Sequence, residues 1–397
     1  MKLLLLHMLV HMLVAQNPCR VVFCIAEQFD SVVDLNSFVQ TCSHAYQVLN
    51  PCVYQYNSQH GSSTALFWAA AQGRETTAQE SLAAHRAARS VQATRTVAEQ
   101  ALFPAADYGH SAIVRLLLAV KGVDPDAKID AVSRETPLIR AAKSGHGEVV
   151  DVLLATQRVD PNARDRWGFR PLLGAAAGPH EAVVRRLLAT PGVDPHVRDQ
   201  NGWTALAWVA QHGHAALVEL LLTTYGVDPQ PRDDAGNTPL FHAARDGHEE
   251  VVDILLRSGA VDIEATDDDG QTALTIAASS GHGGVVQLLL AAGANADIKD
   301  AWSETPLSKA VQGGWVEVVE ILLATETVDR NSRDADGRTP LSRAAEDGYV
   351  EVAELLLAAG ADPEIADDEG KVPREWAEEY GNEILANLLR DGDSMQL

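Results

Sequence analysis

The sequence is short of cysteine, and its few cysteines are grouped at one end. Among 397 residues there are four, Cys19, Cys24, Cys42 and Cys52. Their spacing matches no CxxC metal site, and cysteine is often a small buried apolar residue, so we expect reduced thiols in an intracellular protein. A disulfide framework, for which four cysteines allow three pairings, is the alternative.

Aromatic and basic residues are also scarce. Only 5% of the residues are aromatic against 46% hydrophobic, so the core must consist of Leu, Val and Ala, which suits close-packed short helices. The 31 basic residues are outnumbered by 55 acidic ones, for a formal net charge of −24. Such a charge repels nucleic acid and anionic membranes and favours neutral or basic proteins as partners. We expect no nucleic-acid partner, no membrane partner and a monomer.

The apolar run at the start of the chain is too short to cross a bilayer. Residues 1–15 hold one positive charge and then about a dozen apolar residues, which is the outline of a secretory signal. Two histidines interrupt this run, and Leu13 is large where a cleavage site needs a small residue. We expect a cytoplasmic or nuclear protein, with secretion as the alternative. A helix packed on the following residues, or an unreliable start site, would also explain residues 1–17.

Catalytic motifs are absent from the sequence. It contains no Gly-rich phosphate loop, HExxH, G-x-S-x-G or kinase-type motif, so we expect no enzyme and no cofactor. Six histidines recur at one position of a Gly-His pair: His110, His146, His180, His214, His248 and His282. If these pairs mark successive structural repeats, the equivalent histidine side chains lie one helix-packing distance apart, about 8–10 Å, which is too far for them to share one metal ion. Trp315 and Tyr349 hold the same position, so we expect these side chains to bond loop backbone between repeats.

A regular period runs through most of the chain. A threonine recurs as Thr204, Thr238, Thr272, Thr305 and Thr339, in steps of 34, 34, 33 and 34 residues. Such a period indicates a stacked solenoid, in which each repeat contacts only its neighbours, so a longer chain forms a longer stack.

One repeat, residues 234–267, predicts its own local structure. Gly236 supplies a positive φ for a turn, Thr238 caps a short helix, and Pro239 suits the first helical position. Gly247 ends that helix, and a second helix follows. Its apolar face consists of Val251, Val252, Leu255 and Leu256. The link over 262–269 is expected to be an extended, hairpin-like connector.

The pattern T-P-L-x-x-A-A-x-x-G-H, followed by V-V-x-x-L-L, resembles the ankyrin repeat. It recurs over 135–154, 237–256, 271–290 and 338–357. The resemblance implies an all-α solenoid of about nine or ten repeats. We place degenerate repeats at 62–130, regular repeats at 131–367, a polar capping repeat at 368–391 and a tail at 392–397.

The degenerate repeats carry two irregular features. An Ala-rich run to Gln100 follows the first repeat, and Pro104 falls inside the first helix of the second. A proline in a helix interior costs about 3 kcal/mol, so this junction is expected to be the weakest of the array.

Residues 18–58 form a separate segment with helical apolar spacing. It resembles the degenerate F-box that precedes ankyrin arrays in many fungal proteins, on the strength of Pro18, Ile25, Ala26, Asp34, Leu35, Asn36, Tyr46, Leu49, Asn50 and Pro51. Asn17 stands where that family has Leu, and Ser43 with His44 replaces a basic pair.

These resemblances imply a non-catalytic protein-interaction scaffold. With a working F-box-like segment, the chain would be a substrate receptor of a cullin-type ubiquitin ligase that binds a Skp adaptor through Val22 and Leu35. A plain ankyrin adaptor with a vestigial F-box is one alternative. A secreted or membrane-associated ankyrin effector is another.

In ankyrin proteins, partners are held by the hairpin tips and the exposed face of the first helix. Carried over, the partner-binding residues are Arg166, Trp167, Phe169, Gln200, Asn201, Trp203, Asn237, Arg245, Asp246, Asp268, Asp269, Gln271, Trp302, Glu304, Arg338, Glu346 and Asp347. Trp and Arg are frequent interface hot spots. For Trp167 and Trp203, covering a neighbouring loop is an equal alternative, whereas Trp68 and Trp208 are expected to pack in the core.

Overall fold

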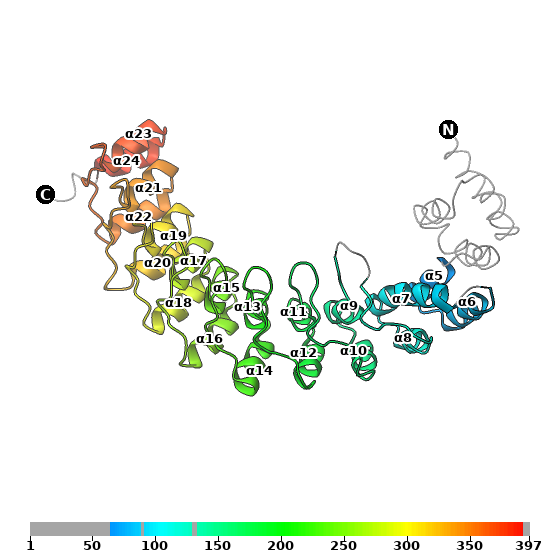
Figure 1. The fold of residues 1–397 in the computed structure, drawn as a ribbon. Coiled ribbons are helices and arrows are strands. Elements are labelled where there is room, and N and C mark those ends of the chain that lie inside the picture. The colour runs from blue at the N-terminus through cyan, green and yellow to red at the C-terminus, as the bar shows by residue number, and fades with distance from the viewer. Residues whose placement is uncertain (1–63, 89–90, 129–132, 392–397) are drawn as a thin grey trace, which may run out of the picture. The chain divides into compact units, whose positions relative to one another are not determined.

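The computed structural model describes residues 64–88, 91–128 and 133–391 (Figure 1). In this part of the chain, twenty helices, α5 to α24, follow one another in ten pairs. This all-helical architecture agrees with the sequence prediction. The segments predicted at 1–17 and 18–58, with Val22 and Leu35, lie outside the described residues, as does the tail.

The chain divides into two compact units. The first comprises residues up to Ala175 together with Arg185–Val193, and the second comprises Ala176–Val184 and Asp194–Leu397. Helices α11 (Pro171–Ala176) and α12 (Glu181–Leu188) therefore contribute to both. The helices of the first unit are α5 (Thr64–Gln72), α6 (Glu75–Ala88), α7 (Val91–Asp107), α8 (Ser111–Leu118), α9 (Pro137–Lys143) and α10 (Gly147–Leu154).

In the second unit the helices form two layers. First helices pack on first helices and second helices on second helices along the stack (Figure 1). The first helices are α13 (Ala205–Gln211), α15 (Pro239–Arg245), α17 (Ala273–Ser280), α19 (Pro306–Gln312), α21 (Pro340–Asp347) and α23 (Pro373–Glu379). The second helices are α14 (Ala215–Tyr225), α16 (Glu249–Arg257), α18 (Gly283–Ala291), α20 (Val316–Leu323), α22 (Val350–Ala358) and α24 (Glu383–Asp391).

Capping and apolar spacing explain why these segments are helices. The hydroxyl of Thr238 accepts a bond from the Phe241 N–H at 3.3 Å, as predicted, and Pro239 takes the first helical position. In α16, Val251, Val252 and Leu255 are fully buried, whereas Leu256 is only half-buried. Leu256 therefore lies at the margin of the predicted apolar face. The core is dominated by Leu, Val and Ala, as the composition requires.

One local expectation needs correction. The Ala-rich stretch expected to be irregular up to Gln100 is helical, in α6 and in α7, because Ala is the best helix former. Pro104 lies inside α7, between buried Phe103 and Ala105, and the helix continues to Asp107.

The connectors between repeats are turns rather than extended strands. Among the described residues one isolated antiparallel bridge, between Arg198 and Thr204, is formed. No helix in this part of the chain combines the length and apolar character needed to cross a membrane.

Leu255→Ala should cost about 2–5 kcal/mol because its side chain has no exposed surface. Each repeat depends on its neighbours, so the loss should spread to α14 and α18, which pack against α16. Amide hydrogen exchange resolved by repeat would measure both effects. Leu256→Ala, a half-buried leucine of the same helix, is the matched control and should cost clearly less. Equal losses in the two variants would contradict the assignment of the core face.

Candidate protein-binding surface

An aspartate organises each hairpin between repeats, and it is buried in every case except Asp267, which is half-buried. In Asp233, Oδ1 accepts bonds from the N–H groups of Ala235 and Asn237, both at 2.9 Å. The same pair of bonds, to the second and fourth following residues, recurs at every member of an aspartate column: Asp165, Asp199, Asp233, Asp267, Asp300, Asp334 and Asp367. One carboxylate oxygen thus fixes the backbone of each hairpin.

The other oxygen, Oδ2, faces the first helix of the following repeat. The residue nine positions later is usually a donor to it, but the donor type changes from repeat to repeat. The hydrogen-bonded pairs are Asp199–Trp208 at 3.3 Å, Asp233–His242 at 3.0 Å, Asp334–Arg343 at 2.7 Å and Asp367–Trp376 at 2.8 Å, and Asp300 forms an ion pair with Lys309 at 3.1 Å. A constant acceptor is therefore matched by a variable donor.

Asp267 shows what happens without the donor. Ile276 holds the position nine residues later, and burial raises the pKa of the Asp267 carboxyl despite its two backbone bonds. At Asp367 burial would also raise the pKa, but bonds from the Lys371 N–H, the Trp376 ring N–H and the Glu369 N–H outweigh it and lower the pKa. The Trp376 ring N–H is thus one of the hydrogen bonds that lower the pKa of Asp367.

The Gly-His pairs join consecutive repeats, as predicted. Nε2 of His248 bonds the Gln211 carbonyl at 2.7 Å, and Nε2 of His282 bonds the Arg245 carbonyl at 2.9 Å. The Trp315 ring N–H donates to the Ser279 carbonyl at 2.9 Å. Within the described residues, no cluster of His, Cys, Asp or Glu could hold a metal ion.

The glycine of this pair is required on two grounds. Gly247 has φ of 77°, a conformation that residues with a side chain rarely adopt. A Cβ at this position would also lie 2.6 Å from the His282 ring. The histidine of one repeat therefore packs directly on the glycine of the preceding repeat.

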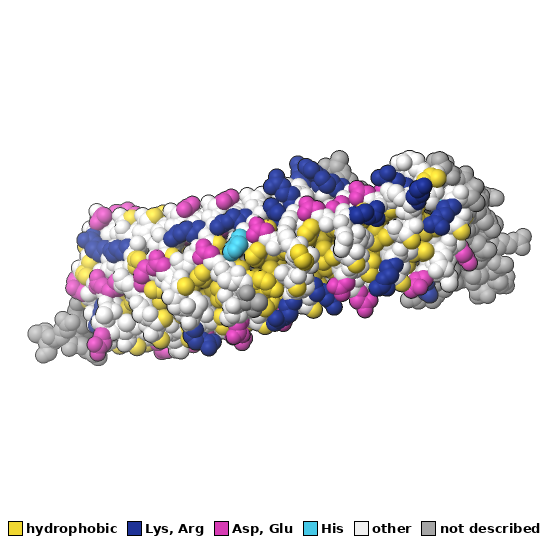
Figure 2. Space-filling view, turned by 60° about the horizontal axis from the view of Figure 1, so that its bottom comes forward, with side chains coloured by type: hydrophobic (Ala, Val, Ile, Leu, Met, Phe, Trp, Pro, Cys, Tyr) yellow, Lys and Arg dark blue, Asp and Glu magenta, His cyan; other side chains and the backbone are white. Residues whose placement is uncertain are grey.

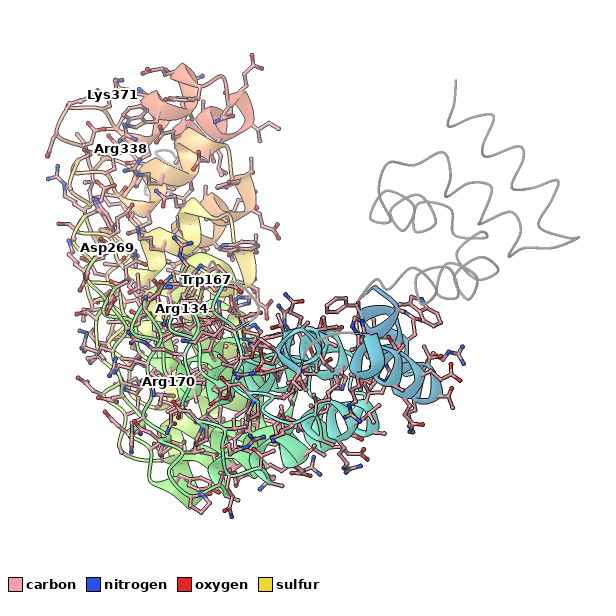
Figure 3. All side chains as sticks on the ribbon, turned by 45° about the vertical axis from the view of Figure 1, so that its right-hand side comes forward. Arg134, Trp167, Arg170, Asp269, Arg338 and Lys371 are labelled. Atoms are coloured by element: carbon pink, nitrogen blue, oxygen red, sulfur yellow. The ribbon has the colours of Figure 1, made fainter. Side chains whose placement is uncertain are left out.

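The predicted partner-binding residues differ in their exposure. The exposed ones are Arg166, Trp167, Gln200, Asn201, Asp246, Asp268, Asp269, Trp302 and Asp347. The half-buried ones are Phe169, Trp203, Arg245, Gln271, Arg338 and Glu346. In the second unit, Asp269, Arg338 and Lys371 follow one another along the hairpin edge (Figure 3).

Two predicted residues are not on the surface. Asn237 and Glu304 are each 8% exposed. The Asn237 amide donates to Asp233 at 3.1 Å, and Glu304 bonds the Lys309 ammonium. Both follow a column aspartate by four residues, a position whose N–H the aspartate bonds, and this draws their side chains inward.

Several aromatic rings support neighbouring side chains. The Trp203 ring centroid lies 4.7 Å from that of Trp208 and 4.1 Å from that of His242 in the next repeat. The Trp203 ring thus packs on the first helices α13 and α15 rather than on a neighbouring loop. Trp167, by contrast, is 43% exposed. Trp208 is half-buried rather than fully in the core, with its ring N–H on Asp199.

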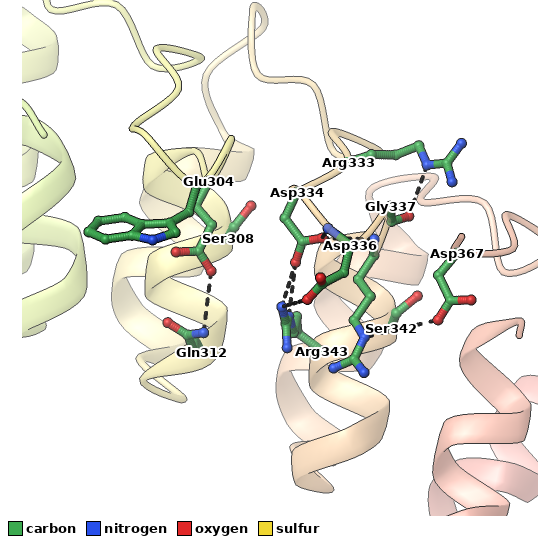
Figure 4. A network of polar contacts seen from close by, with 12 residues as sticks. Glu304, Ser308, Gln312, Arg333, Asp334, Asp336, Gly337, Ser342, Arg343 and Asp367 are labelled. Atoms are coloured by element: carbon green, nitrogen blue, oxygen red, sulfur yellow. Dashed lines mark hydrogen bonds and ion pairs between the residues drawn. The ribbon is translucent and has the colours of Figure 1, made fainter. Parts of the chain in front are cut away.

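A groove of about 460 Å³ lies in the second unit and is lined by residues of three successive hairpins and of helices α19 and α21. We call it the Trp302 groove. Its lining includes Trp302, Glu304, Lys309, Asp334, Asp336 and Arg343. Asp334 and Asp336 both point toward Arg343, and Glu304 points toward Gln312 (Figure 4).

The two cations of this groove are held by carboxylates. Burial would lower the pKa of Lys309, but its bonds with Glu304 and Asp300 outweigh burial and raise the pKa. Arg343 donates to Oδ2 of Asp334 from Nε at 3.0 Å and from Nη2 at 2.7 Å. Lys309 Nζ also lies 5.2 Å from the centroid of the Trp302 ring.

Sequence reasoning did not select Lys309, Arg343 or Asp336. Aligning the repeats would have found the first two, because both stand four residues after the capping threonine, where the residue type varies from repeat to repeat. Asp336 stands two residues after a column aspartate, as the selected Trp302 does.

Comparison with known proteins identifies the family. The family model for ankyrin repeats (3 copies) matches residues 66–165, 172–267, 217–300 and 274–367, which together span more than half of the chain. The chain belongs to the ankyrin repeat family, whose repeats mediate protein–protein interactions. No curated protein matches the chain.

Asp233→Ala should lower the free energy of unfolding by about 2–4 kcal/mol, because it leaves two backbone N–H groups and the His242 ring without their acceptor. Denaturant unfolding of the full chain would measure the loss. The neighbouring Asp234→Ala is the control: that side chain is exposed, and its loss should stay within about 0.5 kcal/mol. A loss of unfolding free energy in Asp233→Ala as small as that in Asp234→Ala would show that the aspartate column does not organise the hairpins.

His242 should make stability depend on pH. Its ring is fully buried, and burial lowers its pKa from 6.5 to about 4, against the opposing attraction of Asp233. Between these two pH values the unfolded chain binds a proton that the native protein does not, so stability falls as pH falls through the window. The loss should reach about 3 kcal/mol.

His242→Gln keeps a side-chain N–H donor for Asp233 but cannot titrate. Its unfolding free energy should fall less than that of the wild type between pH 6.5 and 4. Urea unfolding at a series of pH values would compare the two slopes. Parallel curves would show that His242 is not the titrating group.

Proposed function

We propose that this protein is a non-catalytic scaffold that binds other proteins along the hairpin edge of the second unit. The observation that carries the proposal is that different residues of each hairpin fix its backbone and form its exposed tip. The column aspartate holds the backbone in one conformation, while the next two residues change from Gln200 and Asn201 to Asp268 and Asp269. A rigid backbone with variable exposed side chains is suited to specific recognition.

The partner is a neutral or basic protein. Six acidic side chains stand exposed at the tips of four hairpins: Asp234, Asp268, Asp269, Asp336, Asp368 and Glu369. On the face in Figure 2, by contrast, basic, acidic and apolar side chains are interspersed. Because the tips carry mainly one sign of charge, they would steer a basic partner toward this edge.

Asp268→Asn with Asp269→Asn should slow the association of a captured partner severalfold and flatten its dependence on salt, because exposed rim charges act mainly on association. The full-length chain would capture its partner from cells, and the rates would then be measured with the purified pair. Glu351→Gln with Glu354→Gln removes the same charge from the exposed side of α22 and is the matched control. Equal slowing in both double variants would count against binding at the tips.

A second candidate function adds the ubiquitin-ligase role. It is supported by the F-box-like pattern over residues 18–58, which precedes the repeats. On this hypothesis Val22→Asp and Leu35→Asp, each in the full chain, should abolish co-purification with a Skp adaptor, because a charge would enter the apolar docking face. Val91→Asp is the control, because Val91 is an exposed valine of the repeats, and this variant should retain the adaptor. A buried valine such as Val120 would not serve, because a charge there would disturb the repeats themselves. If the unaltered chain never retains a Skp adaptor, the plain scaffold remains.

A further inference from the structure

We propose that the Trp302 groove binds an arginine side chain of the partner, stacked on the Trp302 ring and paired with Asp336. This inference rests on the proposed scaffold function and names the chemistry of what is bound. Trp302 and Asp336, which both line the groove, belong to consecutive hairpins, and Gln271 of the hairpin before them lines it too. A ligand here would thus contact both repeats at once.

Trp302 provides the stacking surface. It follows its column aspartate by two residues, where the neighbouring hairpins have Asp269 and Asp336, and it is 47% exposed. Its backbone is fixed on both sides: its N–H donates to Asp300 at 2.9 Å, and its carbonyl accepts from the Ala335 N–H at 3.0 Å. An exposed indole on a fixed backbone at a groove is suited to anchoring a partner.

The charges that line the groove favour a cationic ligand. The Lys309 and Arg343 side chains are only 12% and 18% exposed, and their charges are held by carboxylates. Asp300 and Asp334, which pair with them, are 0% and 4% exposed. These two cations are therefore engaged within the protein and offer little to an acidic ligand.

Asp336 is the carboxylate that remains open. Its side chain is 70% exposed, and its contact with Arg343 is long, at 3.5 Å. The stronger partner of Arg343 is Asp334, at 2.7 Å. Asp336 can therefore accept bonds from an incoming donor without leaving a buried cation unpaired.

Arginine fits this combination better than lysine. A guanidinium group is planar, so it can stack on an indole face while its N–H fork bonds a carboxylate, whereas an ammonium group is a compact point charge. Neighbouring tips carry Asp268, Asp269, Asp368 and Glu369, which add to the attraction. The same acidic tips repel the phosphates of a nucleic acid.

The test uses the full-length chain and a short fluorescent peptide in which arginine alternates with serine. Fluorescence anisotropy should show binding that weakens about tenfold or more in Trp302→Ala and in Asp336→Asn. Peptides with citrulline, which has the shape of arginine without its charge, should not bind, and lysine peptides should bind more weakly. Glu354→Gln on α22 removes one exposed charge elsewhere and should leave the affinity unchanged.

Circular dichroism and thermal unfolding would confirm that each variant is folded. Asp336→Asn keeps the test decisive if Trp302→Ala unfolds, because Asp336 is mostly exposed. Equal weakening by Asp336→Asn and Glu354→Gln, equal affinity for arginine and lysine peptides, or no binding to the folded chain would each overturn the proposal. If cellular partners are still captured by Trp302→Ala at full yield, the groove is not their site and the scaffold function stands.

Discussion

The bond between a buried aspartate and the backbone of its own hairpin is the interaction on which the surface of the second unit depends. In each repeat the carboxylate replaces water for two N–H groups that the turn would otherwise leave unpaired. The turn is therefore held by one side chain of its own, and the two residues at its tip are not needed to hold it. Gln200 and Asn201 can stand where another repeat has Asp268 and Asp269 because neither pair shapes the backbone.

The second oxygen of the same carboxylate contacts a residue of the first helix, and the type of that residue determines which side-chain groups lie beside the hairpin tip. Trp208, His242, Lys309 and Arg343 all bond their aspartates, yet they leave different groups beside the tips. The Trp208 and His242 rings pack at a tilt against the Trp203 ring, and this contact makes a predicted binding residue part of the packing. Lys309 and Arg343 instead line the Trp302 groove, and Trp302 itself is exposed. The charged lining of the groove thus follows from Lys309 and Arg343, which occupy the same position in two consecutive repeats.

Much of the fold could be predicted from the sequence because its determinants are local. Thr238, Pro239 and Gly247 fix one helix within a single repeat, and the 34-residue step multiplies it. The burial of Asn237 and Glu304 could not be read in the same way, because each depends on a partner that the turn brings near: Asp233 in one case and Lys309 in the other. The sequence predicts an irregular Ala-rich run up to Gln100, whereas α7 already begins at Val91, because the helix propensity of these residues outweighs the lack of a regular repeat pattern.

The aspartate bonds within hairpins do not depend on the histidine bonds between repeats, and the repeat that contains Pro179 shows this. It stands at the glycine position of a Gly-His pair, where it cannot adopt a positive φ. The carbonyl of Ala177 would be the equivalent acceptor for His214, but Nε2 of His214 is buried without a hydrogen-bond partner among the described residues, and burial lowers its pKa. The aspartate bonds at Asp199 are nevertheless complete. Coupling between repeats can therefore weaken at one step while the tip beside it keeps its geometry, so the binding surface does not require uniform stability along the array.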